Sequence, residues 1–209
     1  QQKCILKRVK LRLKLLLLKV KNNTIKEQQK KTEIGIVIKQ DISENQAKIA
    51  YLGIGSNLGN KRINIENTKY QIQSNNISIL KSSSYFETDS WPDKTKPKFF
   101  NIVIKIKTFL PAEKLLKICN SIEIRLGRKK TKKNAPRTCD IDIIDYNEQI
   151  LTSKNNDLII PHPYLDKRSF VLLPLFEINS GWNHPKSKIS IVKLISSLPI
   201  RDLRSIKQI

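Results

Sequence analysis

The sequence predicts an α+β fold, on the evidence of two periodic patterns and of the order in which they alternate. Between residues 49 and 143, segments with the two-residue apolar period of strands alternate with segments that have the three-to-four-residue period of helices. Their order is strand, helix, strand, strand, helix, strand, which is that of a ferredoxin-like βαββαβ sandwich with C-terminal helical additions. A chain of 209 residues with 39% apolar content has room for one good core.

The first half of the pattern contains two strands and one helix. Ile49 to Ile54 is predicted to be a strand, and a Gly/Asn-rich turn follows, which we expect Ser56 and Asn57 to shape. Residues 61–74 are predicted to be a helix, and residues 77–86 the second strand. The apolar anchors expected for the helix are Ile63, Ile65, Tyr70 and Ile72.

The second half repeats the pattern after a loop at residues 89–97. Residues 99–108 are predicted to be a strand in which Ile and Lys alternate. Pro111 occupies the favoured start of a helix, and Gly127 is expected to end it. The fourth strand follows, and residues 170–176 and 189–198 are predicted to be helices that pack on the sandwich.

The run from Pro136 to Ile143, with the sequence PRTCDIDI, carries the strongest chemical signal. In a strand, Asp140 and Asp142 project from one face and the isoleucines from the other. Carboxylates whose Cα atoms lie about 6 to 7 Å apart repel each other unless a cation lies between them. Such oxygens suit Mg2+ bound to substrate phosphates, although an exposed, solvated D-x-D pair is the plainer alternative.

Cationic residues on both sides of the pair favour the metal interpretation. This is the layout in which a polyphosphate and its metal meet a protein, and it predicts a nucleotide-phosphate site. A lone His in a turn, such as His162 between two prolines, is more commonly structural. The cationic candidates are Arg128, Lys130, Lys133, Arg137, His162 and Arg168.

Seven segments in order resemble the 6-hydroxymethyl-7,8-dihydropterin pyrophosphokinases of folate synthesis. The resemblance covers residues 48–205, and seven pieces in one order are specific. The matching segments are Tyr51 to Asn57, Ser83 to Thr88, Phe99 to Asn101, Glu123 to Arg128, Pro136 to Ile143, Pro161 to Pro163, and Arg168 to Leu175.

The resemblance implies transfer of a diphosphate from ATP to the hydroxymethyl oxygen of the pterin, with AMP as product. It implies that Asp140 and Asp142 hold two Mg2+ ions and that Arg128 and Arg137 neutralise developing charge. Residues 89–97 and 127–138 are expected to be mobile lids, because both loops carry polar residues and Pro without apolar periodicity. The pterin-binding residues that the resemblance implies are Thr88, Phe99, Asn101 and Phe170. The ATP-binding residues are Glu123, Lys130, Lys133, Arg137, Ile143, His162 and Arg168.

Plainer roles stay open for several of these side chains. Phe99 and Phe170 also fit an ordinary core, Asn101 fits a turn cap, and Glu123 fits a helix surface where it pairs with Arg125 or Arg128. A flat heterocycle stacks well between aromatic rings, and a polar amide inside a strand requires a partner. These two arguments favour the pterin roles.

Residues 1–47 form a basic segment with two open interpretations. The runs at 18–25 and 33–39 resemble the C-terminal end of a dihydroneopterin aldolase, so residues 8–41 would be a remnant of that domain, with a linker before residue 48. Lys21 falls where that family keeps a functional lysine, but Asn22 replaces the usual Pro. The alternative is a basic leader with strand-like bias. The chain contains no Met, which predicts a piece of a longer product. Residues 48–209 are predicted to be the pyrophosphokinase domain.

The net charge of +22 favours an alternative hypothesis, in which the chain is a basic ferredoxin-like nucleic-acid-binding module without catalysis. The lysines are scattered and no stacking array of aromatics accompanies them, so we expect no specific nucleic-acid partner. A catalytically inactive relative is a second alternative. The longest apolar run, Leu15 to Leu18, is far too short to cross a membrane. We expect the pyrophosphokinase domain to be monomeric.

The cysteines indicate a cytoplasmic location. Cys4, Cys119 and Cys139 form no C-x-x-C motif, and an odd number leaves one unpaired, which fits a reducing compartment better than a disulfide scaffold. Cys139 is expected to point with the isoleucines as a small buried side chain.

Overall fold

The computed structural model describes residues 46–90, 93–128, 135–155 and 157–209. The aldolase-like segment and Cys4 lie outside these residues, as do Lys130 and Lys133. The structure therefore addresses the predicted pyrophosphokinase domain.

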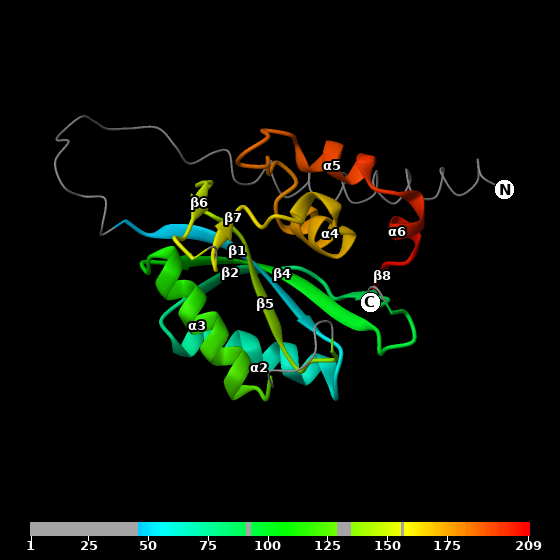
Figure 1. The fold of residues 1–209 in the computed structure, drawn as a ribbon, viewed down its shortest axis with the longest axis horizontal. Helices are drawn as coiled ribbons and strands as arrows, with labels where there is room; N and C mark the ends of the chain where they lie inside the picture. The colour runs from blue at the N-terminus through cyan, green and yellow to red at the C-terminus, as the bar shows by residue number, and fades with distance from the viewer. Residues whose placement is uncertain (1–45, 91–92, 129–134, 156) are drawn as a thin grey trace, which may run out of the picture. The chain divides into compact units, whose positions relative to one another are not determined.

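An antiparallel six-stranded sheet forms the centre of this region (Figure 1). Its strands lie in the order β5-β1-β4-β3-β8, and β2 also pairs with β4. The central strand β1 pairs with β4 on one side and β5 on the other. The strands of the sheet are β1 (Lys48–Ser56), β2 (Ser78–Ser82), β3 (Phe86–Thr88), β4 (Phe99–Thr108), β5 (Asp140–Tyr146) and β8 (Lys207–Gln208).

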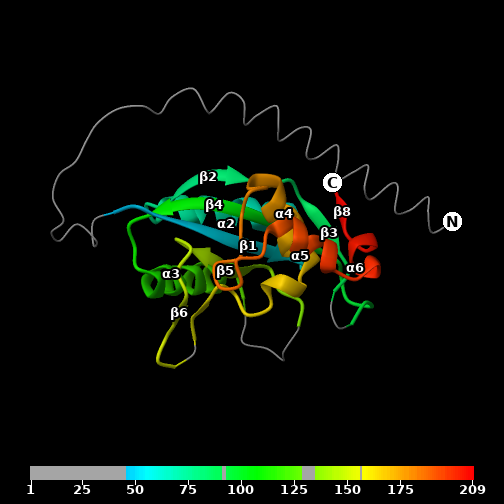
Figure 2. The same ribbon diagram turned by 90° about the horizontal axis from the view of Figure 1, so that it is seen from above.

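Helices cover both faces of the sheet (Figures 1 and 2). α2 (Lys61–Ser74) and α3 (Ala112–Arg125) lie on one face, where the sheet's inward isoleucines and leucines form the main apolar core. α4 (Ser169–Ile178) and α5 (Ile191–Ser197) lie on the other. These helices match the four that the sequence predicted, within two or three residues at each end. No described helix is long and apolar enough to cross a membrane.

Helix α2 has the predicted bounds but only half of the predicted anchors. Ile65 and Ile72 are fully buried, whereas Ile63 and Tyr70 are 54% and 67% exposed, so their assignment was wrong. Residues 65 and 72 are seven apart and share one face of a helix, with Thr68 between them, whereas residues 63 and 70 lie on the opposite face. The helix begins at Asn60, whose side chain accepts a hydrogen bond from the Ile63 amide at 3.1 Å.

Helix α3 ends in a Schellman motif. The Gly127 amide donates to the Ile124 carbonyl at 3.0 Å, and the Arg128 amide donates to the Glu123 carbonyl at 2.9 Å. Gly127 has φ +86°, which a residue with a side chain adopts only under strain. This sharp end folds the chain back, so Arg128 lies over the last turn of the helix beside Glu123.

The predicted single strand over residues 77–86 is divided into β2 and β3, so that prediction was wrong. Ser83 interrupts the ladder because its side-chain oxygen, in place of a carbonyl, accepts from the Val103 amide at 3.0 Å. Next to it, Glu177 of α4 accepts from the Ser84 amide at 3.1 Å and from the Ser84 hydroxyl at 2.6 Å. These side chains take over the hydrogen bonds that a continuous strand would make.

The C-terminal part also contains short elements that the sequence did not predict. β8 adds a strand beside β3 at the edge of the sheet. A separate two-stranded sheet precedes α4. The remaining elements are β6 (Leu151–Thr152), β7 (Ile159–Ile160), a 3-10 helix (Leu165–Lys167) and α6 (Ile200–Arg204).

Candidate active site

The aspartate pair lies on β5 as the alternation predicted. Ile141 and Ile143 are 4% and 5% exposed in the core under the sheet, whereas the two aspartates project from the face that α4 covers. Cys139 is buried with the isoleucines, as expected, and its sulfur lies 3.1 Å from the Thr68 hydroxyl. Burial raises the pKa of the Cys139 thiol to about 12, which disfavours the thiolate form that a nucleophile requires.

Two glycines of β1 form the floor of the site. In the sheet register, Gly55 lies between Asp140 on β5 and Asn101 on β4, and Gly53 lies beside Asp142. Residues that are directly opposite in a sheet point to the same face, so the absence of two side chains leaves an open strip between the carboxylates and the Asn101 amide. A small cleft occupies this strip. It is lined by Gly53, Ile54, Gly55, Asn101, Ile102, Asp140, Asp142, Phe170 and Val171.

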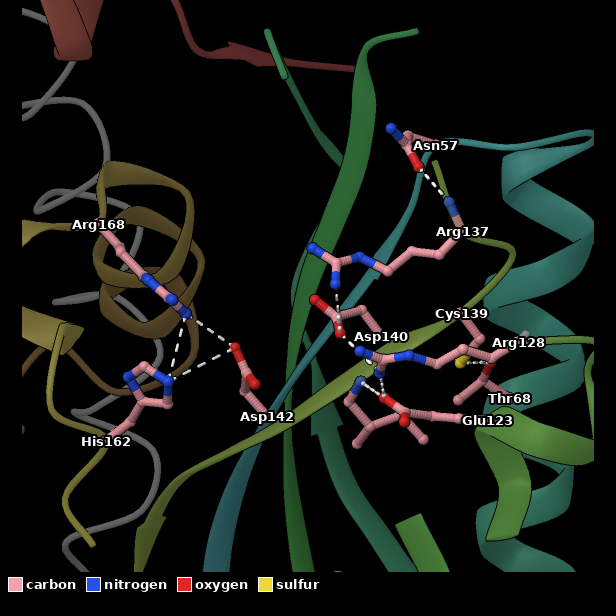
Figure 3. A network of polar contacts seen from close by, with 11 residues as sticks. Asn57, Thr68, Glu123, Arg128, Arg137, Cys139, Asp140, Asp142, His162 and Arg168 are labelled. Carbon is pink, nitrogen blue, oxygen red and sulfur yellow. Dashed lines mark hydrogen bonds and ion pairs between the residues drawn. The ribbon is translucent and has the colours of Figure 1, made fainter. Parts of the chain in front are cut away.

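Asp140 is held by two arginines (Figure 3). Its Oδ1 accepts from Arg128 at 2.9 Å and lies 3.4 Å from an Arg137 nitrogen. Arg128 also donates to Glu123, which is 6% exposed and accepts from the Ile141 amide at 2.7 Å. The last turn of α3 therefore fixes both an arginine and the backbone of the aspartate strand.

Asp142 has a different set of partners (Figure 3). Its Oδ2 accepts from Arg168 at 2.8 Å and lies 3.8 Å from Nε2 of His162. The His162 amide donates to the Ile144 carbonyl at 3.0 Å, and its Nδ1 accepts from the Tyr164 amide at 3.2 Å. His162 therefore has structural bonds on its Nδ1 side and turns Nε2 toward the carboxylate.

Burial and charge together set the ionisation of this network. Burial, reinforced by the Asp142 carboxylate, raises the pKa of Asp140, and the flanking arginines oppose this shift. Burial likewise raises the pKa of Glu123 and lowers that of His162. Burial also works against the charge of Arg128, but Asp140 and Glu123 outweigh it and raise its pKa. A cation placed beside the Asp140 and Glu123 carboxylates would therefore stabilise their ionised forms.

The donor set fits a divalent cation that also binds a phosphate. Among the described residues, Asp140 uses Oδ1 and Asp142 uses Oδ2 for the arginine contacts, so each keeps a second oxygen. No group of three or more His, Cys, Asp or Glu side chains that could hold a metal is found in the described part of the chain. Mg2+ commonly takes one or two carboxylates and completes its shell with water and substrate phosphates.

Of the four residues predicted to contact the pterin, Asn101 and Phe170 line the cleft, Thr88 is bonded to Asn101, and Phe99 lies next to Gly55. Asn101 and Thr88 are buried, and the Asn101 amide donates to the Thr88 hydroxyl at 2.9 Å. Phe99 and Phe170 are half-buried rather than core residues. The Arg137 guanidinium lies 5.7 Å from the Phe99 ring, and that of Arg168 lies 5.6 Å from the Phe170 ring. Each aromatic side chain therefore adjoins an arginine of the aspartate network.

Two predicted nucleotide contacts are placed differently from the others. Glu123 turns its carboxylate into the protein, toward Arg128 and the Ile141 amide. Ile143 points into the core beneath the sheet, away from the two aspartates. A roomier groove of about 500 Å³ lies between α2 and β2 and contains none of the predicted site residues. Its position gives it no part in this chemistry.

Sequence reasoning missed the role of Asn57, which was expected only to shape a turn. Asn57 is 3% exposed, and its side chain joins Arg137 to Ser90 and Pro97. The Arg168 bond to Asp142 was also not anticipated as an ion pair. A polar residue that directly follows a buried strand was the available signal, but its partners lie 33 to 80 residues away.

A carboxylate pair ringed by arginines, on an α+β fold with helices on both faces of its sheet and beside a cleft with aromatic side chains, defines an enzyme of the nucleotide-phosphate-transfer class. The comparison with known families identifies it further. The chain belongs to the 7,8-dihydro-6-hydroxymethylpterin-pyrophosphokinase (HPPK) family, whose model matches residues 51–180.

Individual relatives agree with this assignment. The chain is 40% identical to the 2-amino-4-hydroxy-6-hydroxymethyldihydropteridine pyrophosphokinase of Aquifex aeolicus over 136 residues, which cover 65% of this chain and 82% of that protein. It is 36% identical to a folic acid synthesis protein of Pneumocystis carinii over 163 residues, 78% of this chain. The chain spans 22% of the length of that longer relative.

Solved structures share the fold. A Plasmodium falciparum HPPK-DHPS structure with pterin and p-hydroxybenzoate superposes with a TM-score of 0.59 at 15% identity, covering 80% of this chain and 48% of that chain. A second HPPK-DHPS structure, in complex with substrates, gives a TM-score of 0.55 at 19% identity and covers 73% of this chain and 43% of that chain. At these identities the likeness concerns the arrangement of helices and strands.

Proposed function

We propose that this chain transfers diphosphate from ATP to 6-hydroxymethyl-7,8-dihydropterin, giving AMP and the pterin diphosphate for tetrahydrofolate biosynthesis. One observation carries the proposal: Asp140 and Asp142 line the same cleft as Asn101 and Phe170. The pterin alcohol and the metal-bound polyphosphate have to meet in such a place. The bacterial relative that this chain largely covers has the corresponding name.

In this reaction the pterin hydroxymethyl oxygen bonds to the β-phosphorus, the bond from that phosphorus to the oxygen shared with the α-phosphate breaks, and AMP departs. The hydroxyl proton is released. Asp140 and Asp142 would hold two Mg2+ ions, which lower the charge of the triphosphate. Arg128, Arg137 and Arg168 are within reach of the same carboxylates. They would turn to the phosphate oxygens and stabilise the charge that develops on the migrating and leaving groups.

The remaining residues divide between the two substrates. Phe99 and Phe170 would stack on the pterin, and Asn101 with Thr88 would bond its polar edge. His162 and Arg168 would contact the triphosphate, and the backbone at Ile143 would contact the nucleotide. Glu123 would act on ATP through Arg128, to which it is bonded. Lys130 and Lys133 would help to enclose ATP.

The same proposal covers the organisation of the chain. Residues 48–209 would be the pyrophosphokinase domain, acting as a monomer in the cytoplasm, and residues 1–47 would be either an aldolase remnant with its linker or a basic leader. The order β5-β1-β4 followed by the divided β2 and β3 supports a ferredoxin-like sheet.

The test is AMP release from ATP and Mg2+, with and without 6-hydroxymethyl-7,8-dihydropterin. Pterin-dependent AMP is expected, and it should fall by about two orders of magnitude in Asp142→Asn, the scale of losing one charge-stabilising group. Asp202→Asn, which alters an aspartate on α6 away from the cleft, is the matched control and should leave the rate unchanged. If AMP release does not depend on the pterin and the chain binds RNA tightly in a salt-sensitive way, the proposed enzyme activity is refuted. The chain would then be better described as a basic nucleic-acid-binding module.

A further inference from the structure

The side chain of Asn57 connects two segments that lie beside the cleft, the loop between β3 and β4 and the chain at Arg137. Asn57 directly follows β1 and is 3% exposed. Its Nδ2 donates to the Ser90 hydroxyl and to the Pro97 carbonyl, both at 3.2 Å, while its Oδ1 accepts from the Arg137 amide at 2.8 Å. The Asn57 amide also donates to the Arg137 carbonyl at 3.1 Å. A buried amide that uses both its donor and its acceptor on separate segments is more than a turn former.

On the donor side, Asn57 fastens the base of the loop between β3 and β4. Ser90 and Pro97 are the points where this loop leaves one strand and approaches the next, and the Ser90 hydroxyl donates to the Pro97 carbonyl at 2.6 Å. Thr88 lies two residues before Ser90, and Phe99 lies two residues after Pro97. The hydrogen bonds among Asn57, Ser90 and Pro97 therefore hold together the two ends of this loop. The proposed pterin contacts Thr88 and Phe99 lie next to those ends.

On the acceptor side, Asn57 fixes the backbone of Arg137 by two hydrogen bonds. The guanidinium of Arg137 reaches the Asp140 carboxylate at 3.4 Å. Its Nε is the only buried side-chain nitrogen or oxygen in the described residues without a hydrogen-bond partner. A buried unsatisfied donor beside the carboxylate pair marks a position for an acceptor that a substrate brings.

We infer that Asn57 is a positioning residue that ties the placement of the pterin contacts to the placement of Arg137, so that one amide sets the separation of the two substrates. This inference rests on the proposed function for its kinetic consequence, but not for the hydrogen bonds themselves. A residue that only shaped the turn would not have different effects at the two ends of its side chain.

Two substitutions at Asn57 separate these ends. Asn57→Asp keeps an oxygen for the Arg137 amide but removes the donor and points a carboxylate at the Pro97 carbonyl. Asn57→Ala removes both. Ser90→Ala weakens only the loop end. Asn64→Ala is the matched control, because Asn64 bonds the Ser56 hydroxyl and the Leu58 carbonyl around the same turn but reaches neither Arg137 nor the loop.

Steady-state kinetics should distinguish the variants. In Asn57→Asp and Ser90→Ala, we expect the pterin KM to rise about tenfold, because about one hydrogen bond that orders the loop is lost. The kcat and the ATP KM should stay within about twofold of the wild-type values. In Asn57→Ala, kcat should in addition fall about tenfold, because the Arg137 amide loses its acceptor and only the hydrogen bond from the residue 57 amide to the Arg137 carbonyl remains. Asn64→Ala should match the wild type.

Amide hydrogen exchange by NMR tests the same link without turnover. The Arg137 amide should exchange slowly in the wild type and in Asn57→Asp, and at least tenfold faster in Asn57→Ala, while β1 and β4 amides remain protected as the control for folding. If the Asp and Ala variants show the same kcat, or if the Arg137 amide is equally protected in both, the inference is overturned. A wild-type chain that forms no AMP refutes the proposed function, and the exchange data then decide the inference alone. If the Ala variant does not fold, Asn57→Asp and Ser90→Ala still decide it through the pterin KM.

Discussion

Replacing Gly55 with Ala should separate substrate binding from stability. A Cβ atom at this position would lie 3.1 Å from Oδ1 of Asn101 and 3.5 Å from Cδ1 of Phe99. Ordinary van der Waals contacts of a Cβ atom begin at 3.4 Å, so the Asn101 side chain has to withdraw by a few tenths of an ångström. The 2.9 Å hydrogen bond that the Asn101 amide donates to the Thr88 hydroxyl resists this movement.

We expect the Gly55→Ala substitution to weaken the binding of the pterin. Losing the geometry of one amide hydrogen bond costs about 1 kcal/mol, which corresponds to a rise of several-fold to tenfold in the pterin KM. The folded chain should lose little, because replacing a strand glycine restricts the unfolded state and offsets about 0.5 to 1 kcal/mol of the crowding. The unfolding free energy should therefore stay within about 1 kcal/mol of the wild type.

Two measurements check this prediction: the pterin KM at saturating ATP, and urea unfolding followed by fluorescence. Gly53→Ala is the matched comparison, because its added Cβ meets the flexible end of Ile144 at 3.3 Å instead of the Asn101 amide. The rise in pterin KM should be clearly smaller there. Equal pterin KM values for Gly55→Ala and the wild type would refute the argument that the glycine floor sets the position of Asn101.

Three further predictions concern the polar network. Glu123→Ala should cost about 1 to 3 kcal/mol in urea unfolding, because the Ile141 amide loses its acceptor, whereas Glu123→Gln keeps an acceptor and should cost about half as much; equal costs would contradict this account. Arg168→Gln should strengthen Mn2+ binding measured by electron paramagnetic resonance without nucleotide, because it releases a carboxylate from an ion pair at 2.8 Å, and weaker binding would count against it. Burial lowers the pKa of both His162 and His184 below 6.5, so the stability they contribute is present above that pH and is lost as pH falls through the folded-state pKa values. NMR titration of the two rings checks the sign, and a midpoint above 6.5 for either ring would reverse it.

Local patterns allowed much of this fold to be predicted. The helix over Lys61–Ser74 and the strand over Phe99–Thr108 have their predicted bounds, because each carries its own period and is bordered by turn residues. The faces of the aspartate strand also followed from alternation alone. A two-residue period needs no knowledge of the partner strands.

Features that depend on distant partners were not predictable in this way. The break between β2 and β3 depends on Glu177, which is 93 residues from Ser84, and Asn57 meets Arg137 across 80 residues. Helix α2 shows a local failure: its four apolar residues occupy two opposite faces, and only the packing of the sheet decided which pair was buried. Sequence reasoning thus named the charged groups of the candidate site and Glu123, but not Asn57 as the residue that holds Arg137 in place.

The two arginines on either side of residues 129–134 are secured independently of one another. Arg128 is fixed by the Schellman end of α3 and by Glu123, and Arg137 is fixed by Asn57. Insertions, deletions or substitutions between them therefore need not displace either guanidinium from the carboxylates. The length and composition of this stretch can therefore vary while both arginines keep their places beside Asp140.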